Sequence, residues 1–210
     1  RQGWNAVRRG EEQIEFSFGP GPKAALVFDA EEITTDAGLA ALREVDERFG
    51  LTAMFAERIV DGRWKPMVVH TARRLVREQV YANAAGYEDA NDHTALRKDP
   101  WYRKIIGPVR QGSINPKKQE GLASEATLSR LLGLRRMERG PEFDRVHVDQ
   151  FIRVMGDERP EFITLDVDGY DAETHGQQQL ALFNGYYEQE MYYPLHVSAA
   201  EYGWMMGVKV

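Results

Sequence analysis

The chain contains no cysteine. This absence excludes a disulfide framework, a thiolate metal site and a cysteine nucleophile, and it fits a reducing cytoplasm. No apolar run approaches the ~20 residues of a membrane span, and no signal peptide is readable in a sequence that starts at Arg1. Positive charge is not in excess either. The 27 Lys and Arg residues stand against 33 Asp and Glu, a net −6, which argues against a small, uniformly basic DNA-binding module.

The hydrophobic and aromatic content of the chain is high enough to build a core. The chain has 210 residues and 24.0 kDa, with 42% hydrophobic and 10% aromatic residues, so we expect one large domain or two small ones. Charge is unevenly spread, because the segment from Glu161 onward has eight acidic residues and one base, Lys209, and carries −7. That segment is interpreted either as a solvated acidic surface or as a carboxylate cluster for metal ions.

Hydrophobic periodicity and chain breakers divide the sequence into three regions. They predict a tail with short strands over residues 1–35, helices over 36–156 and strands over 157–210. The expected helices are 36–49, 52–59, 66–86, 92–98, 124–139 and 143–155, and the expected strands are 162–168, 191–197 and 204–208. We expect Pro100 to end the fourth helix, and Arg73, Arg74 and Arg77 to lie off the apolar stripe of the third. Helices followed by strands predict an α+β fold or two domains.

Two aspartates, Asp166 and Asp168, carry the strongest chemical signal. Strand alternation places both carboxylates on one face, about 6.5–7 Å apart. The rest of the strand is Ile, Leu and Val, which belong in a core, so two acids there are costly unless they lie at its end or bind a cation. Mg²⁺ prefers such oxygen ligands. A strand end, where both acids meet solvent or an arginine, is the alternative.

The same four residues also suggest a second enzyme class. Asp-x-Asp-Gly after a hydrophobic strand resembles the first motif of haloacid-dehalogenase-type phosphatases, with Asp166 as the nucleophile and Asp168 as the acid/base. Tyr170 stands where that family usually has Thr or Val. The residues after Asp168 have the pattern of β-hairpins rather than of alternating strands and helices. Both features count against this alternative.

Basic and aromatic residues provide weaker signals for nucleic acid. The candidates for DNA contact are Ser129, Arg130, Arg135 and Arg136 on the helix 124–139, together with Lys117 and Lys118 in the preceding loop. A solvated basic face explains the arginines equally well. The aromatic residues Tyr186, Tyr187, Tyr192, Tyr193 and Trp204 suit stacking on bases. Packing within hairpins is the favoured interpretation of these aromatics.

Several strings, taken in order, carry a family resemblance. They are Thr35–Leu39, Leu42–Arg48, Gly86–Asp92, Leu96–Pro100, Leu122–Ser124, Thr127–Arg130, Leu165–Asp168, Thr174–Gln178, Phe183–Tyr187 and Tyr193–Leu195. Their order and spacing over residues 25–208 resemble the group-1 DDE transposases of bacterial insertion sequences. The most specific strings are GYEDAND at 86–92 and NGYY at 184–187.

This resemblance implies an α+β protein in which a helical region, 36–156, binds DNA ends and supports assembly. Residues 157–210 would then be the opening antiparallel strands of an RNase H-like catalytic domain. The family's Asp-Asp-Glu triad binds Mg²⁺ or Mn²⁺, cuts DNA at terminal inverted repeats and joins the 3′-hydroxyl to target DNA. By position Asp168 is the first Asp, with Asp166 the less favoured holder. A homo-oligomer on DNA in a bacterial cytoplasm, with no membrane contact, is implied as well.

The sequence departs from the family pattern in three places. The second Asp and the Glu are expected beyond Val210, so this chain alone is expected to be inactive. A non-catalytic, DNA-binding remnant of a transposase is the alternative. Residues 133–160 lack the Glu-Asn continuation expected after Arg130, and Tyr170 stands where Thr is common.

Overall fold

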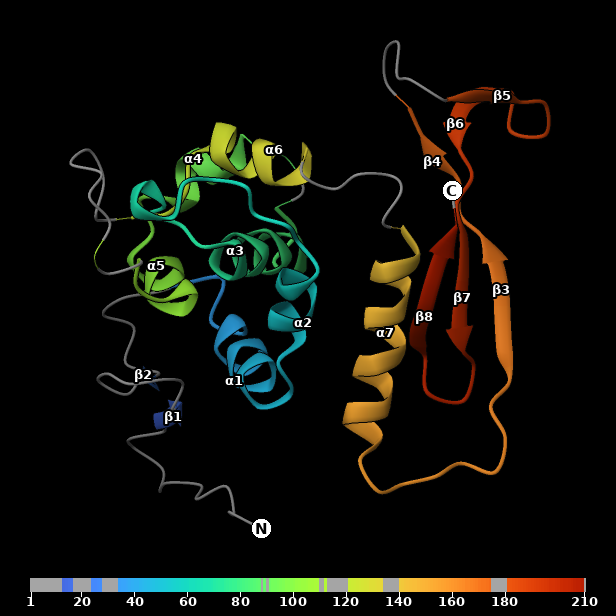
Figure 1. The fold of residues 1–210 in the computed structure, drawn as a ribbon, viewed down its shortest axis with the longest axis horizontal. Helices are drawn as coiled ribbons and strands as arrows, with labels where there is room; N and C mark the ends of the chain where they lie inside the picture. The colour runs from blue at the N-terminus through green and yellow to red at the C-terminus, as the bar shows by residue number, and fades with distance from the viewer. Residues whose placement is uncertain are drawn as a thin grey trace. The chain divides into compact units, whose positions relative to one another are not determined.

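A computed structural model describes residues 13–16, 24–27, 34–87, 89, 91–109, 112, 121–133, 140–174 and 181–209. The chain forms two compact units, residues 1–136 and residues 137–210. We call them the helical unit and the sheet unit, and each is described by itself (Figure 1). The α+β composition expected from the sequence is confirmed.

The helical unit begins with a short antiparallel hairpin, β1 (Gln13–Phe16) and β2 (Ala24–Val27). Its helices are α1 (Leu39–Phe49), α2 (Leu51–Glu57), the 3-10 helix η1 (Lys65–Met67), α3 (Ala72–Ala84), α4 (Asp92–Leu96), α5 (Pro100–Ile106) and α6 (Glu125–Gly133). One buried cluster joins α1, α3 and α5 through Leu39, Tyr81, Tyr102 and Ile105. A second joins α2, α3 and α6 through Ala56, Leu75, Val76 and Leu128.

Two helices differ from the sequence-based expectation. The long helix expected over 66–86 is divided into η1 and α3, because the Thr71 side chain caps α3 by accepting a hydrogen bond from the Arg74 amide at 3.2 Å. A helix was expected to end before Pro100, and α4 does end at Leu96, but Pro100 is also the first residue of α5, a helix that was not expected. Proline suits that position because its missing N–H would have no helical partner there. The Asp99 carboxylate caps α5 by accepting from the amides of Trp101 and Tyr102.

Among its described residues, the sheet unit has one helix and two small antiparallel sheets. Its elements are α7 (Gly140–Met155), β3 (Leu165–Gly169), β4 (Ala172–Glu173), β5 (Leu182–Asn184), β6 (Gln189–Tyr192), β7 (Leu195–Ala199) and β8 (Trp204–Lys209). The sheet orders are β3-β7-β8 and β4-β6-β5. The register of β3 on β7 carries over to β4 on β6, and the Tyr170 amide donates to the Pro194 carbonyl between them. The four strands therefore form one long two-stranded ribbon (Figure 1).

Helix α7 packs against β8. The Trp204 indole donates to the His147 carbonyl at 3.2 Å, and the Asp144 carboxylate accepts from the Val208 amide and pairs with Lys209. A boundary was expected at residue 156, which lies between α7 and β3. The division of the chain into two compact units falls between residues 136 and 137. Helix α7 thus belongs with the strands that follow it.

Strand β3 is open on both faces, although its Ile-Leu-Val pattern predicted a core position. Leu165 is 59% exposed and Val167 is 58% exposed, and both aspartates are exposed. The reason is that α7 covers β8, and within the described ranges no strand pairs with the second edge of β3.

Among the helices of the described ranges, none is both long and apolar enough to cross a bilayer.

Candidate functional site

The interior of the helical unit contains a network of charged side chains. Its centre is Asp46 on α1, which is 1% exposed. The carboxylate accepts from the Thr52 amide at 2.7 Å and hydroxyl at 2.6 Å, from Arg77 Nε at 3.1 Å and from the Tyr81 hydroxyl at 2.9 Å. Burial opposes ionisation of Asp46, but the hydrogen bonds from Thr52 and the charge of Arg77 outweigh it and lower the Asp46 pKa. The carboxylate therefore joins α1 to α2 and α3 as an anion.

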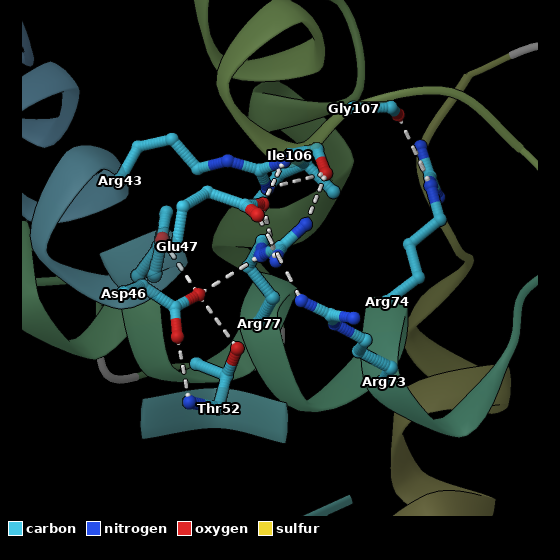
Figure 2. Close-up of polar contacts among 10 residues, drawn as sticks. Arg43, Asp46, Glu47, Thr52, Arg73, Arg74, Arg77, Ile106 and Gly107 are labelled. Carbon is cyan, nitrogen blue, oxygen red and sulfur yellow. Dashed lines mark hydrogen bonds and ion pairs between the residues drawn. The ribbon is translucent and has the colours of Figure 1, made fainter. Parts of the chain in front are cut away.

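Three arginines of this network bind the carboxyl end of α5 (Figure 2). Arg43 and Arg77 each donate to the Ile106 carbonyl at 3.3 Å, and Arg74 Nε donates to the Gly107 carbonyl at 3.2 Å. Cations are favoured there because the last carbonyls of a helix carry partial negative charge. Arg74 and Arg77 were expected to lie off the apolar stripe of their helix, yet both are buried. Their role is to tie helices together.

A buried acid and a buried histidine lie beside this network. Glu78 on α3 and His93 on α4 are both 0% exposed, and Glu78 Oε1 lies 3.9 Å from His93 Nδ1. Neither of these two atoms has a hydrogen-bond partner among the described residues. Burial raises the pKa of Glu78 to about 7, although the Ala123 amide and Arg74 oppose the shift, and burial lowers the pKa of His93. Both groups are therefore driven toward their neutral forms.

The raised pKa predicts that Glu78→Gln stabilises the helical unit at high pH. A carboxyl whose pKa rises on folding contributes stability that is present below its unfolded pKa and is lost as pH rises through the folded value, here about 7. Glutamine removes this loss. We expect Glu78→Gln to exceed the wild type by about 1–3 kcal/mol at pH 8 and to match it near pH 4. Urea unfolding followed by helical circular dichroism at both pH values measures the difference.

Glu57→Gln provides the matched control, because Glu57 is an exposed carboxyl at the end of α2. This variant should follow the wild type at both pH values. A wild type that is more stable than Glu78→Gln at pH 8 would show that the ion pair between Glu78 and Arg74, 3.6 Å apart, outweighs burial.

Asp166 and Asp168 lie on one exposed face of β3, as alternation predicted. In the register with β7, Asp166 is opposite Ser198 and Asp168 is opposite His196, so these four side chains share that face. The Asp168 carboxylate accepts from the Gly169 amide at 2.8 Å. This contact orients the Asp168 side chain.

Gly169 continues the ribbon rather than ending it in a turn. It pairs with Leu195, and a side chain at this position would overlap the Tyr193 ring on the face opposite the aspartates. The glycine of the Asp-x-Asp-Gly string thus allows close packing of Tyr193. An antiparallel continuation of β3 also disagrees with the phosphatase alternative, which requires alternating strands and helices after Asp168.

The metal-ligand set around these aspartates is incomplete within the part of the chain that the structure describes. No group of three His, Asp or Glu side chains able to hold a metal ion occurs there. Two exposed carboxylates on one face nonetheless supply the oxygen ligands that Mg²⁺ prefers.

The candidate DNA contacts are only partly placed. Ser129 and Arg130 lie on α6 and are both exposed, while the neighbouring Leu128 and Leu131 are buried in the second cluster. Lys117, Lys118, Arg135 and Arg136 lie outside the described residues.

Comparison with known proteins gives one result. A family model described as transposase DDE domain group 1 matches residues 16–206. No curated protein and no solved structure matches the chain. The matched range includes both aspartates of β3, the long ribbon and the helices of both units. By this match over most of its length, the chain belongs to the group 1 DDE transposase family.

Proposed function

We propose that this transposase chain acts in metal-dependent DNA cleavage and strand transfer at insertion-sequence ends, with Asp168 as the first aspartate of the triad. The observation that carries the proposal is the pair of exposed carboxylates on one open face of β3, in a chain of a DNA-transposing family. Cleavage of DNA carrying the element's ends by the protein as its gene encodes it, in Mg²⁺ or Mn²⁺ and dependent on Asp168, tests it.

The residues present suit a divalent ion. Asp168 and Asp166 would supply carboxylate oxygens, and a bound Mg²⁺ or Mn²⁺ supplies the Lewis acid for phosphoryl transfer. The second Asp and the Glu of the triad are not assigned to any described residue. For that reason we expect the 210 residues alone not to cut DNA.

The open edge of β3 supports an RNase H-like arrangement. Three antiparallel strands in the order β3-β7-β8 leave β3 at one side, with apolar Leu165 and Val167 exposed. Unpaired edge groups and exposed apolar side chains favour pairing with a further strand. We propose that a further strand of the catalytic sheet pairs there.

Residues 36–156 are proposed to bind DNA ends and to support a homo-oligomer on the DNA, in a bacterial cytoplasm. Exposed Arg130 on α6 offers a phosphate contact. We expect Arg130→Ala to weaken binding of a duplex carrying the element's end by about 3- to 10-fold and to lower the salt slope by about 1, because one counterion-releasing contact is lost. Fluorescence anisotropy between 50 and 200 mM salt measures both.

The comparison variant is Arg145→Ala, because Arg145 is an exposed arginine on α7, the part of residues 36–156 that belongs to the acidic sheet unit, whereas we place the DNA contact in the helical unit. It should leave the affinity for duplex DNA unchanged. If Arg145→Ala weakens binding and Arg130→Ala does not, the DNA contact belongs to the sheet unit.

A further inference from the structure

An aromatic pair lies beside Asp168. The rings of Tyr170 and His196 are stacked, with centroids 5.8 Å apart and planes 12° from parallel. His196 is the register partner of Asp168 on β7, and Tyr170 follows Asp168 by two residues in the continuous ribbon. Since alternate residues of a strand share a face, Tyr170 and His196 lie on the face of the two aspartates. Tyr170 is 55% exposed.

Charge on this part of the chain limits how a DNA strand can be held here. Between residues 161 and 208 there is no Lys or Arg, and the segment carries several acids. Backbone phosphates therefore find no fixed cationic side chain from this segment. An aromatic face, by contrast, attracts the π-face of any base and needs no charge.

We propose that the Tyr170–His196 pair is a stacking shelf that holds an unpaired nucleobase of the DNA strand on which Asp168 acts. The inference rests on the proposed function and adds a binding residue to it. A base stacked on Tyr170 would bring its DNA strand close to the Asp168 carboxylate, because Asp168 precedes Tyr170 by two residues and lies on the same face of the ribbon. Because a base must leave its duplex stack to occupy the shelf, single-stranded or frayed ends should bind better than intact duplex.

Three other exposed tyrosines do not take part in this shelf. Tyr193 lies over Gly169 on the opposite face and contacts Tyr187, whose ring meets that of Tyr186 in the turn after β5. Tyr186 is 86% exposed, so it offers a control substitution of an open tyrosine in the same unit.

The test uses a ten-nucleotide single strand with a central 2-aminopurine, whose fluorescence falls on stacking, added to the 210-residue chain in Ca²⁺. We expect the wild type and Tyr170→Phe to quench the probe equally. Tyr170→Ala should lose the quenching and bind about tenfold more weakly, which corresponds to about 1.4 kcal/mol. Tyr186→Ala should match the wild type. Circular dichroism and thermal unfolding confirm that each variant is folded.

Three results would overturn the shelf. They are unchanged quenching and affinity in Tyr170→Ala, absence of single-strand binding by the wild type, and a DNA-independent change of oligomeric state in Tyr170→Ala. The last result would assign the patch to contact between protein copies. None of them bears on the proposed function, because duplex binding through Arg130 and strand transfer through Asp168 are measured separately.

Discussion

Replacing Asp168 by asparagine is expected to cause near-complete loss of strand transfer. Asparagine keeps the size and one oxygen of the side chain but removes the negative charge that a hard divalent cation requires. The structure adds a reason to favour this aspartate, since the Gly169 amide orients its carboxylate. The measurement is strand transfer of DNA carrying the element's terminal repeats, by the protein as its gene encodes it, in Mg²⁺ and in Mn²⁺.

Asp166→Asn is the matched control on the same face of β3. Asp166 is opposite Ser198, two residues further from the ribbon junction than Asp168. We expect a partial loss, about 10- to 100-fold, typical of a residue that orients a metal ligand. The reverse order of effects would assign the metal to Asp166. Full activity in both variants would show that neither aspartate holds the catalytic metal, whereas absence of strand transfer by the wild type would favour the non-catalytic remnant.

Replacing Asp46 by alanine is expected to destabilise the helical unit by about 3–5 kcal/mol. The substitution removes one buried carboxylate that accepts four hydrogen bonds, and it leaves the guanidinium of Arg77 and the hydroxyl of Tyr81 without that partner. Most of this cost comes from the lost hydrogen bonds of buried groups and from a buried Arg77 charge that keeps, among the described residues, only Glu47 as its acidic partner. Urea unfolding followed by circular dichroism at 222 nm measures it.

Glu47→Ala tests whether burial sets the size of this effect. Glu47 binds the same Arg77 at 3.1 Å and Arg43 at 2.6 Å, but its side chain is partly exposed. Water can replace it, so the loss should be about 1 kcal/mol. Equal losses in the two variants would show that the arginines, rather than the buried carboxylate, hold the network together.

Local signals predicted the helices well and their boundaries less well. Pro100 shows why, because the same residue type ends one helix and begins the next, and only the capping Asp99 distinguishes the two outcomes. The two aspartates of β3 were found because alternation is a local property. The exposure of β3 was not predicted, since it depends on which strand α7 covers, and that choice is made by tertiary contacts such as Trp204 on His147.

The polar core of the helical unit was missed for a related reason. Arg74, Glu78 and Tyr81 recur at helical spacing on one face of α3, and Asp46 recurs with the apolar residues of α1. That spacing was a usable signal for a buried polar face. Charged residues are seldom fully buried unless they are paired, and their partners lie on other helices, where a sequence pattern does not reveal them. Asp46, Arg74 and Glu78 are therefore buried in the helical unit, although charged residues in a sequence are ordinarily expected at the surface.

Arg74 also holds two distant backbone positions with one side chain. Its Nε donates to the Gly107 carbonyl at 3.2 Å and another guanidinium nitrogen donates to the Gly121 carbonyl at 3.0 Å. One guanidinium therefore anchors the residue that follows α5 and a residue shortly before α6. A single substitution at Arg74 would release both anchors at once, so the positions of α5 and α6 within the helical unit depend on one side chain of α3.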